Sequence, residues 1–463
     1  MVGNGMAATR LVEELVARAA PYDITIVGEE DAPSYNRILL SAVLEGSHPV
    51  DQLWLQRQEW YDAQGIVVRT GTRAGVIDRG DGAVVLEDGE RLPYDRLVLA
   101  TGSIPTLPPI RGLVGVDGRL HPKVHAFRSL ADCRRLDAAV PQARRAVVVG
   151  GGLLGLQVAR ALAIRGLEVE IVEGSSHLLS SQVGQHAGVV LRRTLRKLGT
   201  EVYTHTRAVR LGDAGVRLDN GYTLDADLVV LTAGGRPSTA LAKRAGLFVR
   251  RGVVVGARLE SVTDERIHAI GDCAEHRGRT TGFVSPAWEQ AGVVAALLAG
   301  EATTYAGSRT VARLRANDLD VAVLGDPERT EGQVVEVANP ISGTYRKVVV
   351  RDGVVEAAAM VGDLSRVGLF TQLYDRRTVL GPEEPGMLLM ADRPADERST
   401  LLPDEAEVCA CAGVSAGRIR ACRDQDEVAA RTRATTGCGG CTPVVRALLE
   451  SERSAERARA LSR

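Results

Sequence analysis

The stretch RRAVVVGGGLLGLQVARALAIRGLEVEIVEG, residues 144–174, decides the fold class of this chain. It opens with an alanine and valine run whose β-branched residues favour a buried strand. Glycines then mark a tight turn, after which alanine and leucine recur at helical spacing. Residues 167–172, LEVEIV, then return to strand composition. Strand, turn, helix and strand in this order predict parallel strands joined by a crossover helix, and hence an α/β fold.

The turn of this unit carries Gly150, Gly152 and Gly155 in the spacing G-x-G-x-x-G. In this spacing the first glycine permits the turn, the second lets backbone approach a pyrophosphate, and the third brings helix against strand. Glu173 ends the second strand, where a carboxylate accepts hydrogen bonds from ribose hydroxyls. The same carboxylate would repel a 2′-phosphate, and the GSSH that follows it holds no arginine. We therefore predict that this loop favours NADH over NADPH.

The N-terminus repeats the design, because Gly3, Gly5 and Ala8 have the same spacing and Glu29 follows the next strand. One such match is weak evidence, but two copies in strand–loop–helix context, each followed by an acid, predict two nucleotide sites. Only two residues precede Gly3, where a strand normally has about five. We expect either a true start further upstream or a shortened central strand.

The composition argues against several classes of protein. Apolar residues make up 45% of the 463 positions, which is ordinary for a globular chain of several domains. The 57 basic and 58 acidic residues nearly cancel, so we expect no nucleic-acid partner. No apolar run is long enough to span a membrane, and no signal-peptide pattern is present. Most of the seven cysteines lie after residue 408. A secreted disulfide scaffold would spread its cysteines more evenly, so we expect a cytoplasmic protein.

Four cysteines near the C-terminus suggest a redox or metal centre: EVCACAG holds Cys409 and Cys411, and TTGCGGCTP holds Cys438 and Cys441. A redox disulfide would use the C-x-x-C pair and leave the first pair without a role. Zinc accepts four thiolates, although zinc ribbons usually pair two C-x-x-C motifs. An iron–sulfur cluster needs thiolates among backbone N–H groups, and the glycines of CGGC allow that approach. These residues favour the cluster and leave the other two open. The remaining cysteines are expected to be isolated and buried: Cys133, Cys273 and Cys422.

Several stretches resemble flavoprotein reductases that carry two dinucleotide-binding domains. YDRLVLATGSIP (94–105) is similar to the strand and turn that close their FAD site, and IHAIGDCAEH (267–276) is similar to their second FAD motif. FRSLADCRRL (127–136) and FVSPAWEQAG (283–292) extend the likeness. The resemblance implies FAD contacts from Thr101 and Gly102 at the turn, Arg128 and Asp272 near the phosphates and ribityl chain, and the backbone near Val284 at the flavin ring.

The segment YNRILLS (35–41) resembles the flavin part of NADH-dependent assimilatory nitrite reductases and of nitrate reductase electron-transfer subunits. The resemblance implies that Arg37 meets the FAD pyrophosphate. No C-x4-C pair lies in this segment or in the helix after Ala8, so we do not expect a disulfide reductase. No acid–base dyad is evident either. Hydride transfer needs orientation from the protein while the cofactor carries the chemistry, so we predict no catalytic side chain.

The cysteine pattern C-A-C followed by C-G-G-C-T-P resembles the bacterioferritin-associated-ferredoxin-like 2Fe–2S module that is appended to the same flavin region in those reductases. This resemblance implies that Cys409, Cys411, Cys438 and Cys441 hold a 2Fe–2S cluster. The interval between the two pairs is somewhat shorter than is usual for the module. We therefore expect a helical turn to be missing there.

Together the resemblances imply an electron path from NADH through FAD and a 2Fe–2S cluster. No sirohaem or 4Fe–4S domain follows Cys441 in the sequence, so we expect electrons to leave for a redox partner. The expected partner is the catalytic subunit of a nitrate reductase, with nitrite reductase second. Two alternatives stay open: an NADH:ferredoxin or rubredoxin reductase, and a redox- or iron-sensing flavoprotein without steady turnover.

The predicted fold class is α/β, with two Rossmann-like dinucleotide-binding domains for FAD and NAD, an α+β domain and a small helical 2Fe–2S domain. Short strand-like runs and the Asp352-Gly353 turn signal mark the α+β region. The expected boundaries are 1–115 with 236–305 for FAD, 116–235 for NADH, 306–395 for the α+β domain, 396–407 for a linker, 408–450 for the cluster module and 451–463 for a charged tail.

Overall fold

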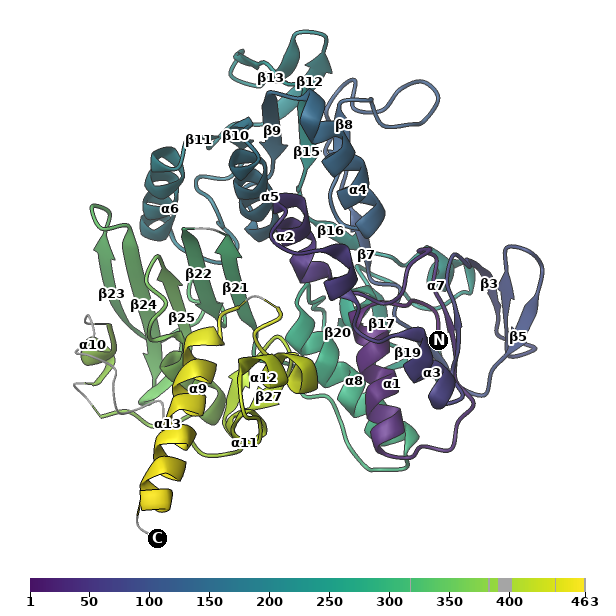
Figure 1. Cartoon of the computed structure of the whole chain (residues 1–463). Coiled ribbons are helices and arrows are strands. Elements are labelled where there is room, and N and C mark those ends of the chain that lie inside the picture. The colour runs from purple at the N-terminus through teal and green to yellow at the C-terminus, as the bar shows by residue number, and fades with distance from the viewer. Residues whose placement is uncertain (317, 382–383, 390–401, 438, 462–463) are drawn as a thin grey trace. The chain divides into compact units, whose positions relative to one another are not determined.

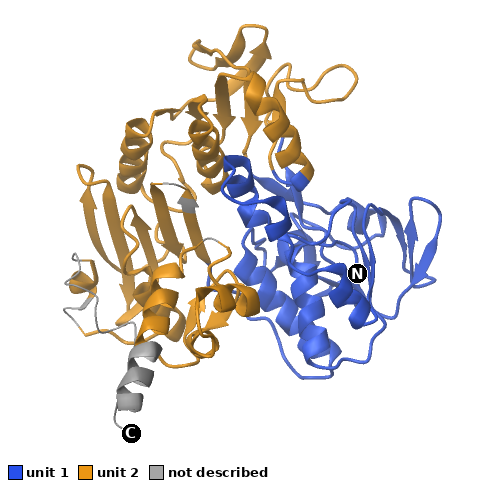
Figure 2. Ribbon diagram, viewed as in Figure 1, with its two compact units in different colours: residues 1–107, 128–130, 234–310 blue, residues 108–127, 131–233, 311–463 orange. Residues whose placement is uncertain are grey.

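The structure is a computed structural model, and it describes residues 1–316, 318–381, 384–389, 402–437 and 439–461 (Figure 1). The chain forms two compact units (Figure 2). Unit 1 comprises residues 1–107, 128–130 and 234–310, and unit 2 comprises residues 108–127, 131–233 and 311–463. The two nucleotide loops predicted from the sequence therefore belong to different units.

Unit 1 is built on a mixed sheet in the order β20-β17-β18-β19-β6. Val2 forms parallel bridges to Leu99 and to Val27, and so connects this sheet with the parallel pair β1-β2. The strand before the first loop is thus reduced to one bridging residue, in agreement with the short stretch before Gly3. The strand bounds are β1 (Thr25–Val27), β2 (Val67–Arg69), β6 (Leu97–Leu99), β17 (Val253–Val255), β18 (Glu260–Ser261), β19 (Asp264–Ala269) and β20 (Ala274–His276).

Two long helices of unit 1, α1 (Met6–Ala17) and α8 (Val284–Leu298), pack against one another. Leu11 and Leu15 of α1 are one turn apart, so they lie on one face of the helix. They share a buried core with Val294 of α8 and with Leu97 of the sheet. This packing fixes the start of α1, which follows the first glycine loop.

Shorter elements complete unit 1. A three-stranded antiparallel sheet has the order β3-β4-β5, and β7 pairs with β16. Their bounds are β3 (Ala74–Asp78), β4 (Ala83–Leu86), β5 (Arg91–Pro93), β7 (Ser103–Pro105) and β16 (Gly235–Pro237). The short helices are η1 (Arg37–Leu39), α2 (Leu40–Glu45), η2 (Val50–Leu53), α3 (Gln58–Ala63), α7 (Ala240–Arg244) and η4 (Gly271–Cys273).

Unit 2 contains a five-stranded parallel sheet in the order β11-β10-β9-β15-β8. Residues 144–174 form the strand, helix and strand that the sequence predicts, namely β9, α5 and β10. Val147 and Val148 of β9 are buried, as expected for a central strand covered on both faces. The bounds are β8 (Val124–Ala126), α4 (Leu130–Ala139), η3 (Val140–Gln142), β9 (Arg145–Val149), α5 (Leu153–Ile164), β10 (Glu168–Val172), α6 (Gln185–Lys197), β11 (Thr200–Tyr203) and β15 (Leu228–Leu231).

Two antiparallel sheets also belong to unit 2, one in the order β12-β13-β14 and one in the order β21-β22-β25-β24-β23. Asp352 and Gly353 join β24 to β25 and have φ of 52° and 75°. Positive φ at both central residues suits a tight hairpin, as their sequence predicts. The bounds are β12 (Ala208–Gly212), β13 (Gly215–Leu218), β14 (Thr223–Leu224), β21 (Val311–Ala316), β22 (Leu319–Leu324), β23 (Gln333–Asn339), β24 (Thr344–Arg351), β25 (Val354–Val361), α9 (Val367–Arg376) and α10 (Glu384–Leu389).

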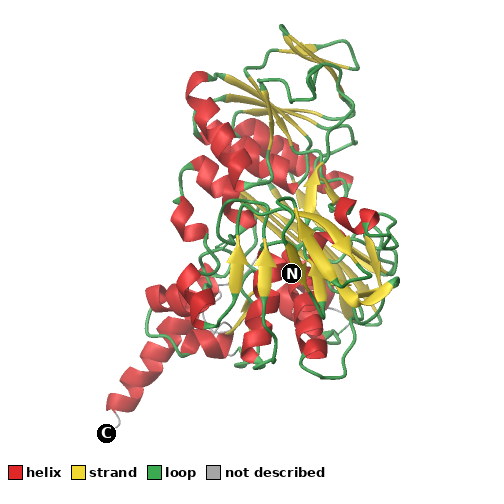
Figure 3. Ribbon diagram, turned by 90° about the vertical axis from the view of Figure 1, so that its right-hand side faces the viewer, coloured by secondary structure: helices red, strands yellow, loops and turns green. Residues whose placement is uncertain are grey.

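The C-terminal part of unit 2 is a small, mainly helical module with one short antiparallel strand pair, and Figure 3 shows its helices close to the C-terminus. Val414, Val445 and Leu448 are fully buried in its own core. The elements are β26 (Glu407–Cys409), β27 (Val414–Ser415), α11 (Ala416–Arg420), α12 (Gln425–Thr432) and α13 (Thr442–Leu461). The last helix thus continues past residue 450. Residues 396–401 of the expected linker lie outside the described residues.

The architecture confirms the predicted fold class: two Rossmann-like regions, an α+β region and a small helical module. Within the described residues, no helix is both long enough and apolar enough to cross a bilayer.

Candidate cofactor sites

The first glycine loop leaves an open space where a phosphate would approach. Gly3 has φ of 109°, and a methyl group built on it would lie 2.2 Å from the Ala100 carbonyl oxygen. Gly5 caps the start of α1, and a methyl group built there would have no atom within 4 Å. Ala8 is fully buried where the helix meets the sheet. The loop therefore needs glycine at its first position and keeps free space at its second.

A charged network of unit 1 brings together three predicted FAD residues, Arg37, Arg128 and Asp272. Arg128 Nη2 lies 2.7 Å from Asp272 Oδ2, and Ser103 Oγ donates to the same oxygen at 2.7 Å. Arg37 Nη1 donates to the Arg128 carbonyl oxygen at 3.1 Å, and its other end pairs with Glu30. Two guanidinium groups and a carboxylate that can accept hydrogen bonds therefore lie next to one another. This donor set suits a pyrophosphate with a hydroxylated chain.

The other predicted FAD residues lie at the ends of the neighbouring elements. Thr101 Oγ1 donates to the Ser238 carbonyl oxygen at 2.7 Å, and Gly102 follows it with φ of 66°. A methyl group built on Gly271, next to Asp272, would lie 3.3 Å from Ala7 Cβ and 3.8 Å from Ala287 Cβ. The second FAD motif therefore lies beside the starts of α1 and α8. Val284 is the first residue of α8.

Glu29 is the predicted FAD residue that lies apart from this network. Its side chain is 70% exposed, and its Oε1 lies 3.5 Å from Arg73 Nε. A methyl group built on Gly28, the residue before it, would lie 2.7 Å from Asn4 Cβ. The backbone before Glu29 thus borders the glycine loop, while its side chain points to a surface arginine.

The second glycine loop repeats this geometry in unit 2. Gly150 has φ of 118°, and a methyl group built on it would lie 2.6 Å from the Thr232 carbonyl oxygen. Gly152 caps α5 and has no atom within 4 Å of a built methyl group. A methyl group on Gly155 would lie 1.9 Å from the Gly150 carbonyl oxygen, so helix and strand approach too closely for a side chain. The three glycines thus have three different structural roles.

Glu173 reaches back to this second loop. Its Oε2 accepts from the Gly151 N–H at 2.6 Å, and its Oε1 accepts from the Ser175 N–H at 2.7 Å. In a dinucleotide-binding fold, the ribose lies next to a carboxylate held in this way beside the glycine turn. The structure therefore brings the predicted acid and the predicted loop together.

The helices that follow the two loops have free N-terminal ends. Neither α1 nor α5 has a side-chain cap or an acidic residue in its first turn, and the same is true of α8. Unpaired N–H groups and the positive end of the helix dipole favour an anion at such an end. This fits a pyrophosphate at each glycine loop and, at α8, a flavin ring that gains negative charge on reduction.

The cysteine module places its described thiols in and beside its core. Cys409 and Cys441 are buried, and Cys411 is half-buried against the same cluster. The Thr435 N–H donates to Cys441 Sγ at 3.2 Å, a contact that favours a thiolate. Cys438 lies outside the described residues, and those that are described contain no group of three potential metal ligands. The four-cysteine ligand set is therefore argued as a proposal below.

The three isolated cysteines are buried, as predicted. Cys422 Sγ donates to the Arg418 carbonyl oxygen at 3.4 Å. Burial raises the pKa of Cys133 to about 12 and also raises the pKa of Cys273. None of the three resembles a reactive thiolate.

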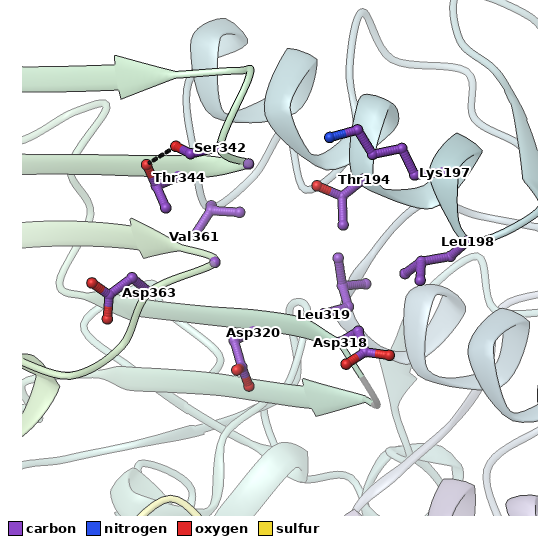
Figure 4. Close-up of a pocket in the computed structure, with 12 residues that line it drawn as sticks. Thr194, Lys197, Leu198, Asp318, Leu319, Asp320, Ser342, Thr344, Val361 and Asp363 are labelled. Atoms are coloured by element: carbon purple, nitrogen blue, oxygen red, sulfur yellow. Dashed lines mark hydrogen bonds between the residues drawn. The ribbon is translucent and has the colours of Figure 1, made fainter.

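A pocket of about 340 Å³ lies in unit 2 between the C-terminal end of α6 and the sheet of β21 to β25 (Figure 4). Lys197, Asp318 and Asp320 line it, together with other residues of these elements. None of the predicted cofactor residues lines this pocket, so it is separate from the sites described above.

Comparison with known proteins fits this geometry. Residues 1–291 match the family profile of the pyridine nucleotide-disulphide oxidoreductases. The chain belongs to this family. Residues 407–451 match the BFD-like [2Fe-2S] binding domain. The chain therefore combines a pyridine nucleotide-disulphide oxidoreductase region with a 2Fe–2S domain, and the predicted cofactor classes, FAD, a nicotinamide dinucleotide and a 2Fe–2S cluster, are confirmed at this level.

Two relatives from Bacillus subtilis (strain 168) align with 97% of this oxidoreductase. A nitrite reductase [NAD(P)H] is 35% identical, and 57% of its own length is covered. An assimilatory nitrate reductase electron transfer subunit is 32% identical, with 59% of its length covered. The chain thus spans little more than half of each relative. The predicted resemblance to nitrite and nitrate reductase flavin regions is confirmed.

A solved structure confirms the fold of the oxidoreductase. The covalent putidaredoxin reductase–putidaredoxin complex superposes with a TM-score of 0.76 at 26% identity. The alignment covers 83% of this chain and 94% of the other. Despite the family name, the sequence holds no cysteine before Cys133, so the first loop has no redox disulfide beside it.

Sequence reasoning missed some residues of these sites. The Tyr35 hydroxyl donates to Glu30 Oε2 at 2.6 Å and accepts from the Leu130 N–H at 2.9 Å. Burial raises the pKa of Tyr35 well above its ordinary value. Thr232 was missed too, and its hydroxyl lies 3.1 Å from the Gly150 carbonyl oxygen. The position of Tyr35 in YNRILLS was an available signal, whereas Thr232 gave none.

Proposed function

We propose that this oxidoreductase carries electrons from NADH through FAD and a 2Fe–2S cluster to a separate catalytic subunit. A nitrate reductase subunit is the favoured partner, and a nitrite reductase is second. One observation carries the proposal: two open glycine loops and a cysteine module occur on one chain. The printed names of the relatives support the partner class. We place this reaction in the cytoplasm, where NADH is available and thiols stay reduced.

FAD is proposed to bind in unit 1. Gly3, Gly5 and Ala8 shape the loop for its pyrophosphate, and the free N–H groups of α1 face that charge. Arg37 and Arg128 would pair with the phosphates, and in that state Asp272 accepts from the ribityl hydroxyls. The remaining proposed contacts come from Glu29 at the ribose, Thr101 and Gly102 at the turn, and Val284 at the flavin ring.

NADH is proposed to bind in unit 2. Gly150, Gly152 and Gly155 form the loop for its pyrophosphate, while Glu173 accepts from the ribose hydroxyls. The Gly151 and Ser175 N–H groups hold the carboxylate of Glu173 in place before the coenzyme arrives. Such preorganisation lowers the ordering cost of binding.

The cluster is proposed to be held by Cys409, Cys411, Cys438 and Cys441. When bound, the cofactors supply the redox chemistry: FAD takes a hydride from NADH, and a 2Fe–2S cluster takes electrons singly. The protein contributes orientation and a polar shell, of which the Thr435 N–H at Cys441 Sγ is the described part. No side chain is proposed to act as an acid or base.

Single cysteine variants of the full chain test this proposal. Cys409→Ser and Cys438→Ser should lose iron and acid-labile sulfide, keep NADH-driven reduction of ferricyanide, and lose NADH-dependent nitrate reduction with the partner subunit. Cys422→Ser is the matched control, because this buried thiol hydrogen-bonds to a carbonyl oxygen and should leave all three properties unchanged.

Each other outcome has a definite meaning. Full nitrate reduction by Cys438→Ser would place the cluster off the electron path and refute the proposal. Wild type that reduces free ferredoxin or rubredoxin, and not the nitrate reductase subunit, would support the ferredoxin or rubredoxin reductase alternative. Wild type without turnover towards any acceptor would support a sensor.

A further inference from the structure

An arginine of unit 2 bears on which nicotinamide coenzyme the second loop accepts. A methyl group built on Gly174 would lie 3.2 Å from Cγ and 3.3 Å from Nε of Arg207. The Arg207 side chain therefore fills the space that a side chain at position 174 would need. Position 174 directly follows Glu173, the residue proposed to bind the ribose. The sequence next to Glu173 holds no arginine, but the fold supplies one from the segment after β11.

Main-chain hydrogen bonds fix this placement. The His205 N–H donates to the Ser175 carbonyl oxygen at 2.8 Å, and the Thr206 N–H donates to the Glu173 carbonyl oxygen at 3.2 Å. The segment after β11 therefore runs beside the segment after β10. The backbone of Arg207, which follows Thr206, is therefore held near Gly174, and its side chain packs over that glycine.

The charged groups beside Gly174 suit the binding of a phosphate. Arg207 is exposed, and its guanidinium has no hydrogen-bond or ion-pair partner in the part of the chain that the structure describes; its backbone N–H donates to Asp219 Oδ1 and its carbonyl oxygen accepts from the Asp219 N–H. Both carboxylate oxygens of Glu173 already accept backbone N–H groups. A planar guanidinium binds a phosphate through two parallel hydrogen bonds.

We propose that Arg207 binds the 2′-phosphate of NADPH, so that NADPH is a second and weaker hydride donor beside NADH. The proposal rests on the proposed function, because it uses the same glycine loop and the same hydride transfer. Glu173 continues to favour NADH, since it accepts from a free 2′-hydroxyl and repels a phosphate there. Arg207 offsets part of that repulsion.

The test compares Arg207→Gln with wild type in the full chain. We expect kcat/KM for NADPH to fall at least about tenfold, and kcat/KM for NADH to fall by no more than about threefold, because only NADPH carries the phosphate. By calorimetry, the Kd of adenosine 2′,5′-bisphosphate should rise at least about tenfold, while that of 5′-AMP should hardly change. Arg217→Gln on β13 removes the same charge from another exposed arginine and should change none of these values.

Three results would overturn the inference: no binding of adenosine 2′,5′-bisphosphate to wild type, no change in that binding in Arg207→Gln, or an equal loss for both coenzymes. A wild type that does not oxidise NADH would refute the proposed function instead. The calorimetric comparison needs no turnover, so it still decides on Arg207 in that case.

Discussion

At the scale of single residues, the second and third glycines of the NADH loop give opposite predictions. Gly152→Ala should leave the unfolding temperature close to wild type, because a methyl group there meets no atom within 4 Å. It should still weaken NADH binding, because it fills the space for the pyrophosphate. Gly155→Ala should lower the free energy of unfolding by about 1–3 kcal/mol or more, because its methyl group overlaps the Gly150 carbonyl oxygen.

Thermal unfolding and NADH titration of both variants check this pair. Strong destabilisation by Gly152→Ala, or none by Gly155→Ala, would contradict the roles assigned to the two glycines.

Asp264 gives a prediction about pH. Its side chain is 8% exposed, and hydrogen bonds from Arg266, followed by one from Arg79, lower its pKa to about 2. A carboxyl whose pKa is lower in the folded state stabilises the fold above its unfolded pKa and loses that effect on acidification. Asp264→Asn should therefore cost about 2 kcal/mol at neutral pH.

The cost should shrink as the pH falls from about 4 towards 2, the interval between the unfolded and folded pKa values. Denaturant unfolding of both proteins across this interval measures it. A difference that stays constant with pH would show that the charge of Asp264 contributes little.

At the scale of elements, the free N-terminus of α5 gives the next prediction. Leu154→Asp places a carboxylate in the first turn of α5, where it interacts favourably with the helix dipole, by about 0.3–1 kcal/mol. The same charge should oppose the pyrophosphate and raise the Kd of NADH at least about tenfold. Ile164→Asp adds the same charge at the exposed other end of the helix and serves as the control.

Equilibrium binding of NADH to both variants measures the effect. Equal weakening in the two variants would show that overall charge, and not the helix end, governs binding.

Elements with local signals could be predicted from the sequence, and contacts between distant segments could not. The two glycine loops and the Asp352-Gly353 hairpin turn depend on backbone conformations that only a few residue types adopt, so composition reveals them. The placement of Tyr35 beside Leu130 depends on the whole fold of unit 1. The same holds for Arg207, which reaches Gly174 only because two loops run side by side.

At the scale of the whole molecule, the central claim is that one chain holds a complete path from a hydride donor to a one-electron centre. The two nucleotide loops lie in different units, and the cysteine module has its own core. Each part would be of little use to an electron carrier without the others. The claim therefore concerns transfer between the parts and not the presence of each cofactor.

Anaerobic reduction of the full-length protein by NADH, followed by optical and electron paramagnetic resonance spectroscopy, tests this claim most directly. We predict that substoichiometric NADH bleaches the flavin and then produces the signal of a reduced 2Fe–2S cluster within the time of turnover. Cys422→Ser should behave in the same way. One result would contradict the account: NADH reduces the flavin, but an intact cluster stays oxidised even though dithionite can reduce that cluster.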